Sequence, residues 1–298
     1  MPLLLGPGVV ALSFVLWGLL PLYYQFLPTI NMWELLSHRV IWSVVLLALL
    51  MRLAARPVPW ATLRAEPRQL LLILCAGPVM SISWCMFTWC LTTGQVLATS
   101  LAFFMTPLFN IVLAVLFLKE RLTPQKHLAV ALALAGLAYM LFQYGELPWF
   151  SLIMGGNFAV YGLIKKKIHY PTDQSLYLEA LVQLPLALLF VFWLTLSGHP
   201  SLFLDGSLGD RLMLMGSAPA TLIPVGLFCY GMIRTRLSTV GLLQYIEPSL
   251  AFLLAVFWFG EHPDPVKEVG FMFVWAGLLV SLLPLHRLRR RALSRPPQ

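Results

Sequence analysis

Long runs of apolar residues alternate with short polar connections along the whole chain. The runs are about as long as a helix that crosses ~30 Å of hydrocarbon, which takes roughly 20 residues. Transmembrane β-strands have only ~10 residues and alternate polar with apolar positions, so continuous apolar runs exclude a β-barrel. The pattern predicts ten membrane-spanning helices, at residues 7–25, 33–52, 69–91, 96–118, 126–143, 148–165, 176–197, 211–231, 239–260 and 267–285.

The composition agrees with this class of protein. Of the 298 residues, 59% are hydrophobic and 11% are charged, whereas about 25% of the residues of an average soluble domain are charged. The connections are too short to hold a water-soluble domain. We therefore predict an all-α polytopic membrane protein.

Positive charge is divided unequally between the two sides of the predicted bundle. Seventeen of the twenty Lys and Arg residues fall on one side: Arg52, Arg56, Arg64, Arg68, Lys119, Arg121, Lys126, Lys165, Lys166, Lys167, Arg234, Arg236, Arg287, Arg289, Arg290, Arg291 and Arg295. The positive-inside rule then places both termini in the cytoplasm. Topology and lipid headgroups explain the net charge of +8, and a nucleic-acid partner has no support.

The second half of the chain repeats the pattern of the first. At an offset of 141 residues, the stretch "FFMTPLFNIVLAVLFLKERLTP" aligns with "QYIEPSLAFLLAVFWFGEHPDP", which pairs Pro107 with Pro248 and Glu120 with Glu261. Chance matching of apolar segments rarely keeps prolines and a glutamate in one register. The two glutamates are expected to cap or brace helix ends.

Each repeat contains five predicted spans, and five is an odd number. The second copy must therefore enter the membrane from the opposite side, which is a common plan of secondary transporters. We expect a first repeat at 7–143, an inverted second repeat at 148–285 and a basic cytoplasmic tail at 286–298.

These stretches, together with "WELLSHRVIWS" and "RLSTVGLLQYIEPSLAFLLAVFWFGE", resemble the RarD branch of the EamA-type permeases, in the drug/metabolite transporter superfamily. The resemblance covers about residues 8 to 285. It implies a bacterial inner-membrane permease of ten helices with two EamA repeats, a central cavity and alternating access. The branch is associated by name with chloramphenicol sensitivity. The resemblance implies no set of substrate-contacting residues, so the candidate site residues are inferred from the pattern of this sequence.

Charged groups stand at the start of the second predicted span. Glu34, His38 and Arg39 lie within six positions, and Arg39 is about 9 Å inside the span at 1.5 Å per residue. Arg39 could snorkel to the interface, with Glu34 and His38 forming a structural contact. Equally, these groups could face a cavity and hold substrate, because ionisable residues inside a membrane usually face protein or water.

Aromatic and polar stripes on other predicted helices form the remaining candidate cavity. Such stripes more often serve packing, but gathered from both halves they also suit a pocket for a small aromatic or moderately apolar solute. The candidates are Trp17, Tyr24, Trp84, Phe103, Asn110, Asn157, Tyr161, Gln244 and Tyr245.

The ninth predicted helix carries a carboxylate directly before a proline. Proline removes one helix hydrogen bond, so Pro248 and its repeat partner Pro107 are candidate hinges. Glu247 is either a packed, hydrogen-bonded group or a site for a proton or a cationic solute. Glu179 in the seventh helix is a weaker candidate of the same kind.

Other classes of function lack their motifs. The chain has no GxxxxGK[ST] loop for ATP, no HExxH and no GxSxG, and its histidines and cysteines do not cluster as metal ligands. We therefore expect a secondary transporter that exports small metabolites or drugs, with no cofactor and no metal. A membrane scaffold or sensor, or an embedded enzyme, is the alternative.

Gly136 and Gly277 are expected to be close-packing sites, and a homodimer through them is compatible with the pattern.

Overall fold

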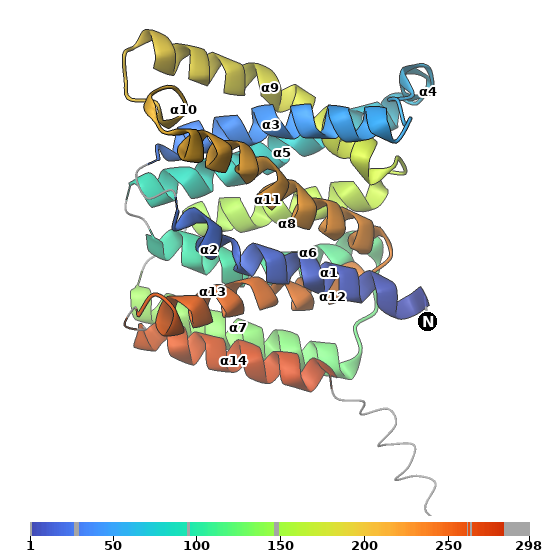
Figure 1. Ribbon diagram of the computed structural model, residues 1–298. Coiled ribbons are helices and arrows are strands. Elements are labelled where there is room, and N and C mark those ends of the chain that lie inside the picture. The colour runs from blue at the N-terminus through green and yellow to red at the C-terminus, as the bar shows by residue number, and fades with distance from the viewer. Residues whose placement is uncertain are drawn as a thin grey trace, which may run out of the picture.

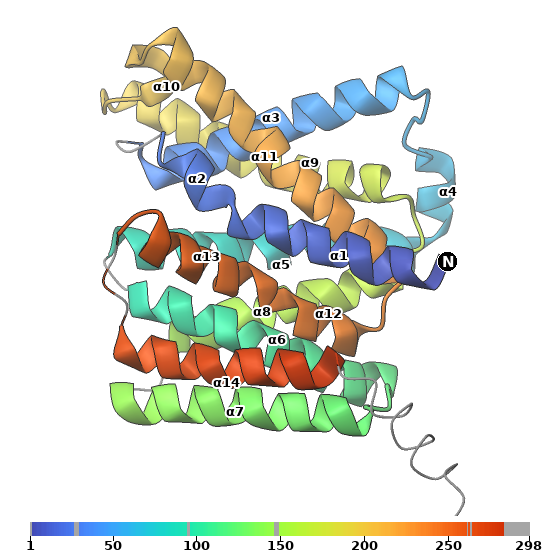
Figure 2. The ribbon, with the colours of Figure 1, turned by 60° about the horizontal axis from the view of Figure 1, so that its bottom comes forward.

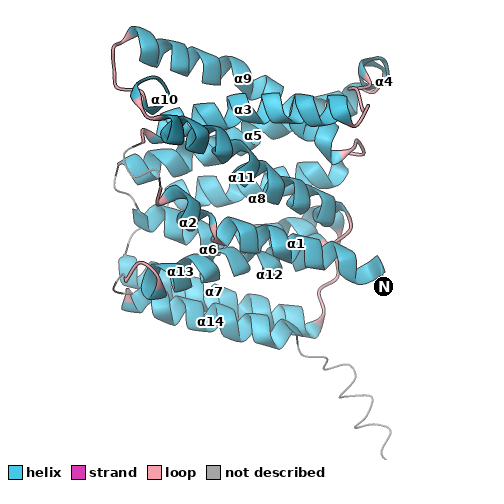
Figure 3. Cartoon of the chain, in the orientation of Figure 1, coloured by secondary structure: helices cyan, strands magenta, loops and turns pink. Residues whose placement is uncertain are grey.

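The structure, a computed structural model, describes residues 2–26, 30–93, 96–145, 149–260, 262 and 264–282. These residues form helices joined by turns and loops, with no strand among them (Figures 1 and 3). The helices are α1 (Pro2–Gly18), α2 (Leu20–Tyr24), α3 (Met32–Leu53), α4 (Trp60–Ala65), α5 (Pro67–Thr92), α6 (Val96–Leu118), α7 (Pro124–Tyr144), α8 (Trp149–Lys167), α9 (Thr172–Leu196), α10 (Leu202–Asp205), α11 (Leu208–Ile233), α12 (Leu237–Gln244), α13 (Ile246–Phe257) and α14 (Pro265–Leu282).

Each of the ten predicted segments coincides with one long helix or with a broken pair. The first is divided into α1 and α2, and the ninth into α12 and α13, while α4 and α10 lie in connections. Eight stretches in the described residues are long and apolar enough to cross a membrane. The helices α8 and α14 are not among them. α8 ends in three lysines, and α14 carries Lys267 and Glu268 in its first turn. The predicted tail lies outside the described residues.

The bundle has two chemically different ends. One end, called the basic end here, holds the first residues of α1, the helix α4 and the connections that follow α6, α8 and α11 (Figure 1). At this end a Cβ on Gly6 would lie 2.9 Å from the Arg234 carbonyl oxygen, and Lys166 donates to the Thr235 carbonyl. Because α1 begins here and α8 ends here, the first helices of the two halves run in opposite directions.

Helix packing repeats between the halves. The helix α1 packs on α11, α12 and α13, and its counterpart α8 packs on α5 and α6. Likewise α3 packs on α11, and α9 on α5. Three further large contacts join counterparts directly: α3 to α9, α6 to α12 and α7 to α14. Figures 1 and 2 show α3 and α9 along one edge of the bundle and α7 with α14 along the other.

Side chains tie helix ends together at the basic end. The Glu120 carboxylate accepts hydrogen bonds from the backbone N–H groups of Leu237 at 2.7 Å and Ser238 at 3.1 Å, so it caps the start of α12. The capping role predicted for Glu120 is thereby confirmed, while Glu261 lies outside the described residues. Lys126 donates to the hydroxyls of Ser238 and Thr239 at 2.9 and 2.7 Å, so this lysine has partners inside the protein.

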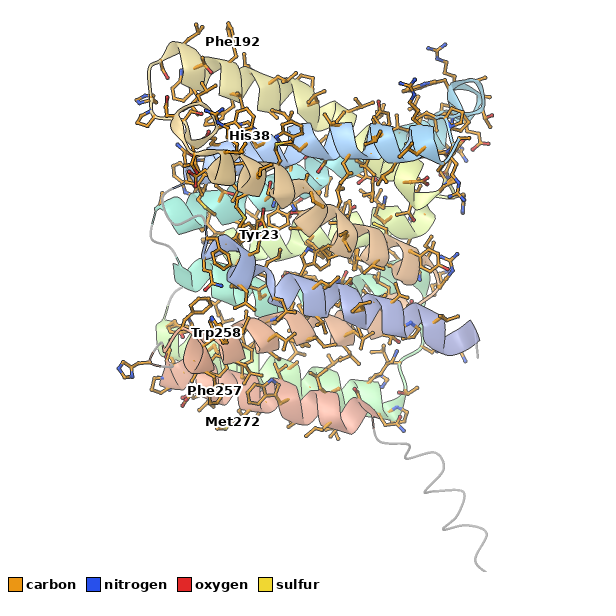
Figure 4. The ribbon with its side chains drawn as sticks, in the orientation of Figure 1. Tyr23, His38, Phe192, Phe257, Trp258 and Met272 are labelled. Carbon is orange, nitrogen blue, oxygen red and sulfur yellow. The ribbon has the colours of Figure 1, made fainter. Side chains whose placement is uncertain are left out.

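Large apolar side chains point outward around the bundle. Figure 4 shows four such side chains: Phe192 on α9, Phe257 at the end of α13, Trp258 in the turn after it and Met272 on α14. Each of them is more than half exposed. Water would penalise such a surface, whereas lipid chains solvate it. The exposed surface therefore fits the apolar spans, and together they show a membrane protein.

The glycines of α7 and α14 serve close packing within the chain. A Cβ on Gly136 would lie 3.0 Å from the Gly270 carbonyl oxygen, and one on Gly277 would lie 2.9 Å from the Ala129 carbonyl oxygen. Both glycines thus permit the contact between α7 and α14, as the small-residue rule predicts. These faces are occupied within one chain, so a homodimer would need a different surface.

Replacing Gly277 by Ala should therefore destabilise the protein. The new Cβ meets backbone, which cannot rotate away, so we expect a loss of about 1–3 kcal/mol in the free energy of unfolding. Gly156→Ala is the matched control, because a Cβ there meets nothing within 4 Å. Thermal unfolding in detergent measures both variants, and equal stability of the two would contradict the packing described here.

Candidate substrate site

Arg39 is enclosed by protein rather than turned toward lipid. It lies on α3, and its guanidinium carbon is 4.0 Å from the centroid of the Trp84 ring on α5. The Tyr24 hydroxyl on α2 and the Cys85 thiol also interact with this guanidinium. A cation stacked on an indole face is favourable when both are shielded from water. Three predicted site residues, Arg39, Trp84 and Tyr24, thus meet in one cluster, called the arginine cluster below.

Glu34 and His38 face a different neighbour, the short helix α10. The Glu34 carboxylate accepts hydrogen bonds from the Ser201 hydroxyl at 2.7 Å and from the backbone N–H groups of Leu202 and Phe203, both at 3.1 Å. The His38 ring stacks on Phe203 with 4.4 Å between centroids (Figure 4). Of the two roles considered for this pair, the contacts favour bracing of α10 over contact with substrate.

An aromatic layer joins α1, α8 and α11 in the middle of the bundle. It consists of Phe14, Trp17, Phe158, Tyr161 and Phe228, with neighbouring ring centroids 5.5–6.3 Å apart. At the offset of 144 residues, Phe14 corresponds to Phe158 and Trp17 to Tyr161, so the layer draws equivalent residues from both halves. The Trp17 indole N–H is buried and has no hydrogen-bond partner. Such a donor is available to a ligand.

The crossing of α6 and α12 contains buried amides. The Asn110 side-chain N–H₂ donates to the Gln244 side-chain oxygen at 2.7 Å, and the Asn110 oxygen is buried without a partner. The Tyr245 hydroxyl donates to the Phe104 carbonyl at 3.1 Å. Asn110 and Gln244, both candidates for the site, are therefore in direct contact, and Tyr245 links the end of α12 to α6.

Two further candidates lie toward the end opposite the basic end. Phe103 on α6 contacts Phe87, with 6.0 Å between ring centroids, and Phe87 contacts Trp84 at 5.9 Å. Asn157 lies on α8, one turn before Tyr161. Tyr24, Trp84, Phe103 and Asn157 are all half-buried, whereas Tyr161, Asn110, Gln244 and Tyr245 are buried.

Two broken helices pack against each other beside this set. The break between α1 and α2 precedes Pro21, and the break between α12 and α13 precedes Pro248. They meet where a Cβ on Gly18 would lie 3.0 Å from the Glu247 carbonyl oxygen, so only glycine permits this approach. Glu247 itself is half-buried in the first turn of α13. Pro107, by contrast, stands within the continuous helix α6.

The structure also contains a buried ion pair that the sequence reasoning missed. The Lys165 ammonium lies 2.7 Å from a Glu179 carboxylate oxygen and 2.7 Å from the Ser175 hydroxyl, which donates to the same oxygen at 2.7 Å. The Tyr161 hydroxyl donates to the second carboxylate oxygen at 3.1 Å and lies 3.7 Å from the Cys229 sulfur. The side chains of Lys165 and Glu179 are only 4% and 5% exposed. The sequence offered one signal for this ion pair: Lys165 follows Tyr161 by four residues, so both lie on the same face of α8.

Comparison with known proteins agrees with this architecture. The model of the EamA-like transporter family matches the chain twice, at residues 4–142 and 148–283. The chain belongs to this family. It is 33% identical to the protein RarD of Escherichia coli, with 94% of each chain covered, and 35% identical to the uncharacterized transporter YojE of Bacillus subtilis, with 95% covered. It is also 30% identical to the chloramphenicol-sensitive protein RarD of Pseudomonas aeruginosa over 94% of each chain.

The membership confirms the resemblance to the RarD branch and the drug/metabolite transporter superfamily. One solved protein crystal structure shares the fold, with a TM-score of 0.69 at 19% identity, and the alignment covers 93% of this chain and 96% of that one. The family and its relatives support a membrane transporter of bacterial type rather than an enzyme.

Glu34→Ala should loosen α10. The change leaves two backbone N–H groups and the Ser201 hydroxyl without their charged acceptor, so we expect a loss of about 2–3 kcal/mol in the free energy of unfolding. Hydrogen exchange at residues 202–205 should rise. Asp173→Ala is the control, because its ion pair with Arg56 is 3.9 Å long and partly exposed and should contribute under about 1 kcal/mol. Unchanged exchange in α10 would rule out the bracing role.

Proposed function

We propose that the chain is a secondary transporter that exports small metabolites or drugs across the bacterial inner membrane by alternating access. In this proposal ten helices cross the membrane as two inverted five-helix repeats, and both termini lie in the cytoplasm. The basic end is then the cytoplasmic end, in agreement with the positive-inside rule. The double family match and the repeated helix packing support the two repeats.

The pair of broken helices beside buried polar groups carries the proposal. Transporters bind their substrates near the bilayer midplane, where discontinuous helices expose backbone groups. Here the breaks before Pro21 and Pro248 meet at Gly18, next to the aromatic layer and its unpaired Trp17 N–H. Bending at these breaks changes access to the middle of the bundle without disturbing the outer helices. Glu247, at the second break, is the proposed group for proton coupling.

The chemistry of the lining suggests the class of substrate. Aromatic rings and two amides, with the arginine cluster away from the basic end, suit a small solute with an aromatic or moderately apolar body and a polar or anionic group. A RarD relative of Pseudomonas aeruginosa is called chloramphenicol-sensitive. Chloramphenicol has an aromatic ring and an amide, so it belongs to the class of solutes proposed here as substrates.

Flux measurements in proteoliposomes test the proposal. Purified protein should move at least one member of a panel of amino acids, nucleosides and aromatic drugs, and an imposed pH gradient should change the rate. Absence of flux across the panel, from protein that remains folded in the liposomes, would count against transport.

Arg39→Lys should lower this flux at least tenfold. Lysine keeps the charge but loses the planar group that stacks on Trp84, so the substrate-binding geometry changes while the charge does not. Arg211→Lys, an exposed arginine at the same end, is the matched control and should keep its flux. Equal flux in the two variants would remove Arg39 from the site.

A further inference from the structure

A groove opens on the side of the bundle near the basic end, where α3 and α11 diverge. Figure 2 shows the two helices spreading apart toward that end, and the start of α9 lines the space between them. The groove has a volume of about 790 Å³, within the ~300–1,000 Å³ range of small-molecule sites. Among the described residues, none that lines it belongs to the arginine cluster or the aromatic layer, so it is separate from the candidate substrate site.

Most of the groove is apolar and faces the surroundings of the bundle. Its rim includes Leu50 on α3 and Ile223 and Ile233 on α11, which are all exposed. The groove therefore opens sideways, toward hydrocarbon rather than toward the middle of the bundle. An apolar chain solvates such a surface better than water does. Deeper in the groove the lining is Leu46, Leu176 and Leu222.

The apolar part of the groove is about as long as one leaflet of a bilayer is thick. It extends along α11 from Leu222 to Ile233, and 11 residues at 1.5 Å each give about 16 Å. Half of a hydrocarbon core of ~30 Å is about 15 Å. A transmembrane helix of another protein would need a face as long as the whole core, so the length favours an acyl chain over a partner helix.

Basic side chains lie at the end of the groove that belongs to the basic end. Arg56 follows α3 and Arg234 follows α11, so both walls end in a guanidinium, and His169 lies in the connection between α8 and α9. The Arg234 guanidinium stacks on the Tyr230 ring, with 3.7 Å to its centroid, and donates to the Tyr230 carbonyl at 2.8 Å. That bond uses one of its five N–H donors and leaves others for an anion.

The balance of charge at this end of the groove is positive. The acidic residue in the lining is Asp173, whose carboxylate lies 3.9 Å from an Arg56 nitrogen in a partly exposed pair. Such a pair is weak and can be exchanged for a better one. Lys166 adds a further positive charge beside Arg234, since it donates to the Met232 carbonyl at 2.6 Å and to the Thr235 carbonyl.

We propose that this groove binds an anionic phospholipid from the leaflet on the basic side of the membrane. The phosphate lies between Arg56 and Arg234, and an acyl chain fills the apolar part as far as Leu222. Guanidinium groups bind phosphate through paired hydrogen bonds, and basic pockets between helices suit anionic headgroups. A zwitterionic lipid would bring an ammonium group next to these guanidinium groups and bind more weakly. The site requires a membrane protein but not transport, so it does not depend on the function proposed above.

Filling the groove tests where the acyl chain binds. A Cβ on Gly226, which lines the groove, meets nothing within 4 Å, so Gly226→Leu places a larger side chain there without a clash at Cβ. Native mass spectrometry of the protein in detergent, titrated with phosphatidylglycerol, should show an affinity at least fivefold below that of the parent. Gly8→Leu is the matched control, because Gly8 is an exposed helical glycine near the basic end with equal free space. Its affinity should change less than twofold, and an unchanged affinity in Gly226→Leu would overturn the proposal.

Removing the two guanidinium groups tests the headgroup site. The parent should bind phosphatidylglycerol at least tenfold more tightly than phosphatidylcholine, and Arg56→Gln combined with Arg234→Gln should abolish this preference. Arg121→Gln, which removes an exposed arginine at the same end but outside the groove, should keep it. Equal binding of the two lipids by the parent would overturn the proposal. Melting temperatures of the same samples separate a loss of lipid binding from unfolding, and if the double variant fails to fold, Gly226→Leu decides.

Inorganic phosphate distinguishes a lipid from a free anion as the occupant. An excess of phosphate should leave the affinity for phosphatidylglycerol within twofold of that in chloride of equal ionic strength, because burial of the acyl chain contributes free energy that phosphate lacks. Displacement of the lipid by phosphate, beyond the effect of chloride, would overturn the lipid as occupant.

Discussion

The whole structure depends on one constraint: in hydrocarbon, a polar group has no water to bind and must find its partner within the protein. The backbone meets this requirement by forming helices throughout the described spans. Side chains meet it in pairs that cross between helices, as Lys165 does with Glu179 and Asn110 with Gln244. Because each such pair fixes two helices relative to each other, polar groups determine how the bundle is assembled, although apolar residues form most of it.

The same constraint explains which features of the fold could be predicted. Span length is a one-dimensional property, so apolar runs locate the helices to within a few residues. Of the two predicted hinges, Pro248 follows a real break, while the break before Pro21 was not predicted. The glycine at position 277 was correctly predicted to be a close-packing site because small residues leave room for a backbone. Pro107 shows the limit of this reasoning. It has the same sequence context as Pro248, yet α6 continues through it, since neighbouring helices can absorb one lost hydrogen bond.

The partners of charged groups could not be predicted in this way. Glu34 and His38 lie on the same face of α3 as Arg39. The Glu34 carboxylate nevertheless binds the hydroxyl of Ser201, which is 167 residues away in the sequence and belongs to the second half of the chain. Lys165 stands beside Lys166 and Lys167, and a run of three lysines at a helix end is typical of headgroup contacts. Only the first is buried against a carboxylate. Helical angle gives the direction of a side chain, but the neighbour in that direction depends on the three-dimensional packing of all the helices.

The two halves repeat their packing but only some of their charges, and this difference has a physical consequence. Alternating access requires two states separated by only a few kcal/mol. Repeated packing of α1 on α11 and of α8 on α5 supplies nearly equivalent interfaces at the two mouths, so opening one while closing the other costs little. The acid–base pair of Lys165 and Glu179 joins α8 to α9 near the basic end, whereas Arg39, toward the other end, contacts Trp84, Tyr24 and Cys85. In the proposed transporter, an asymmetric set of charges on a repeated scaffold would distinguish two states whose helix packing is otherwise similar.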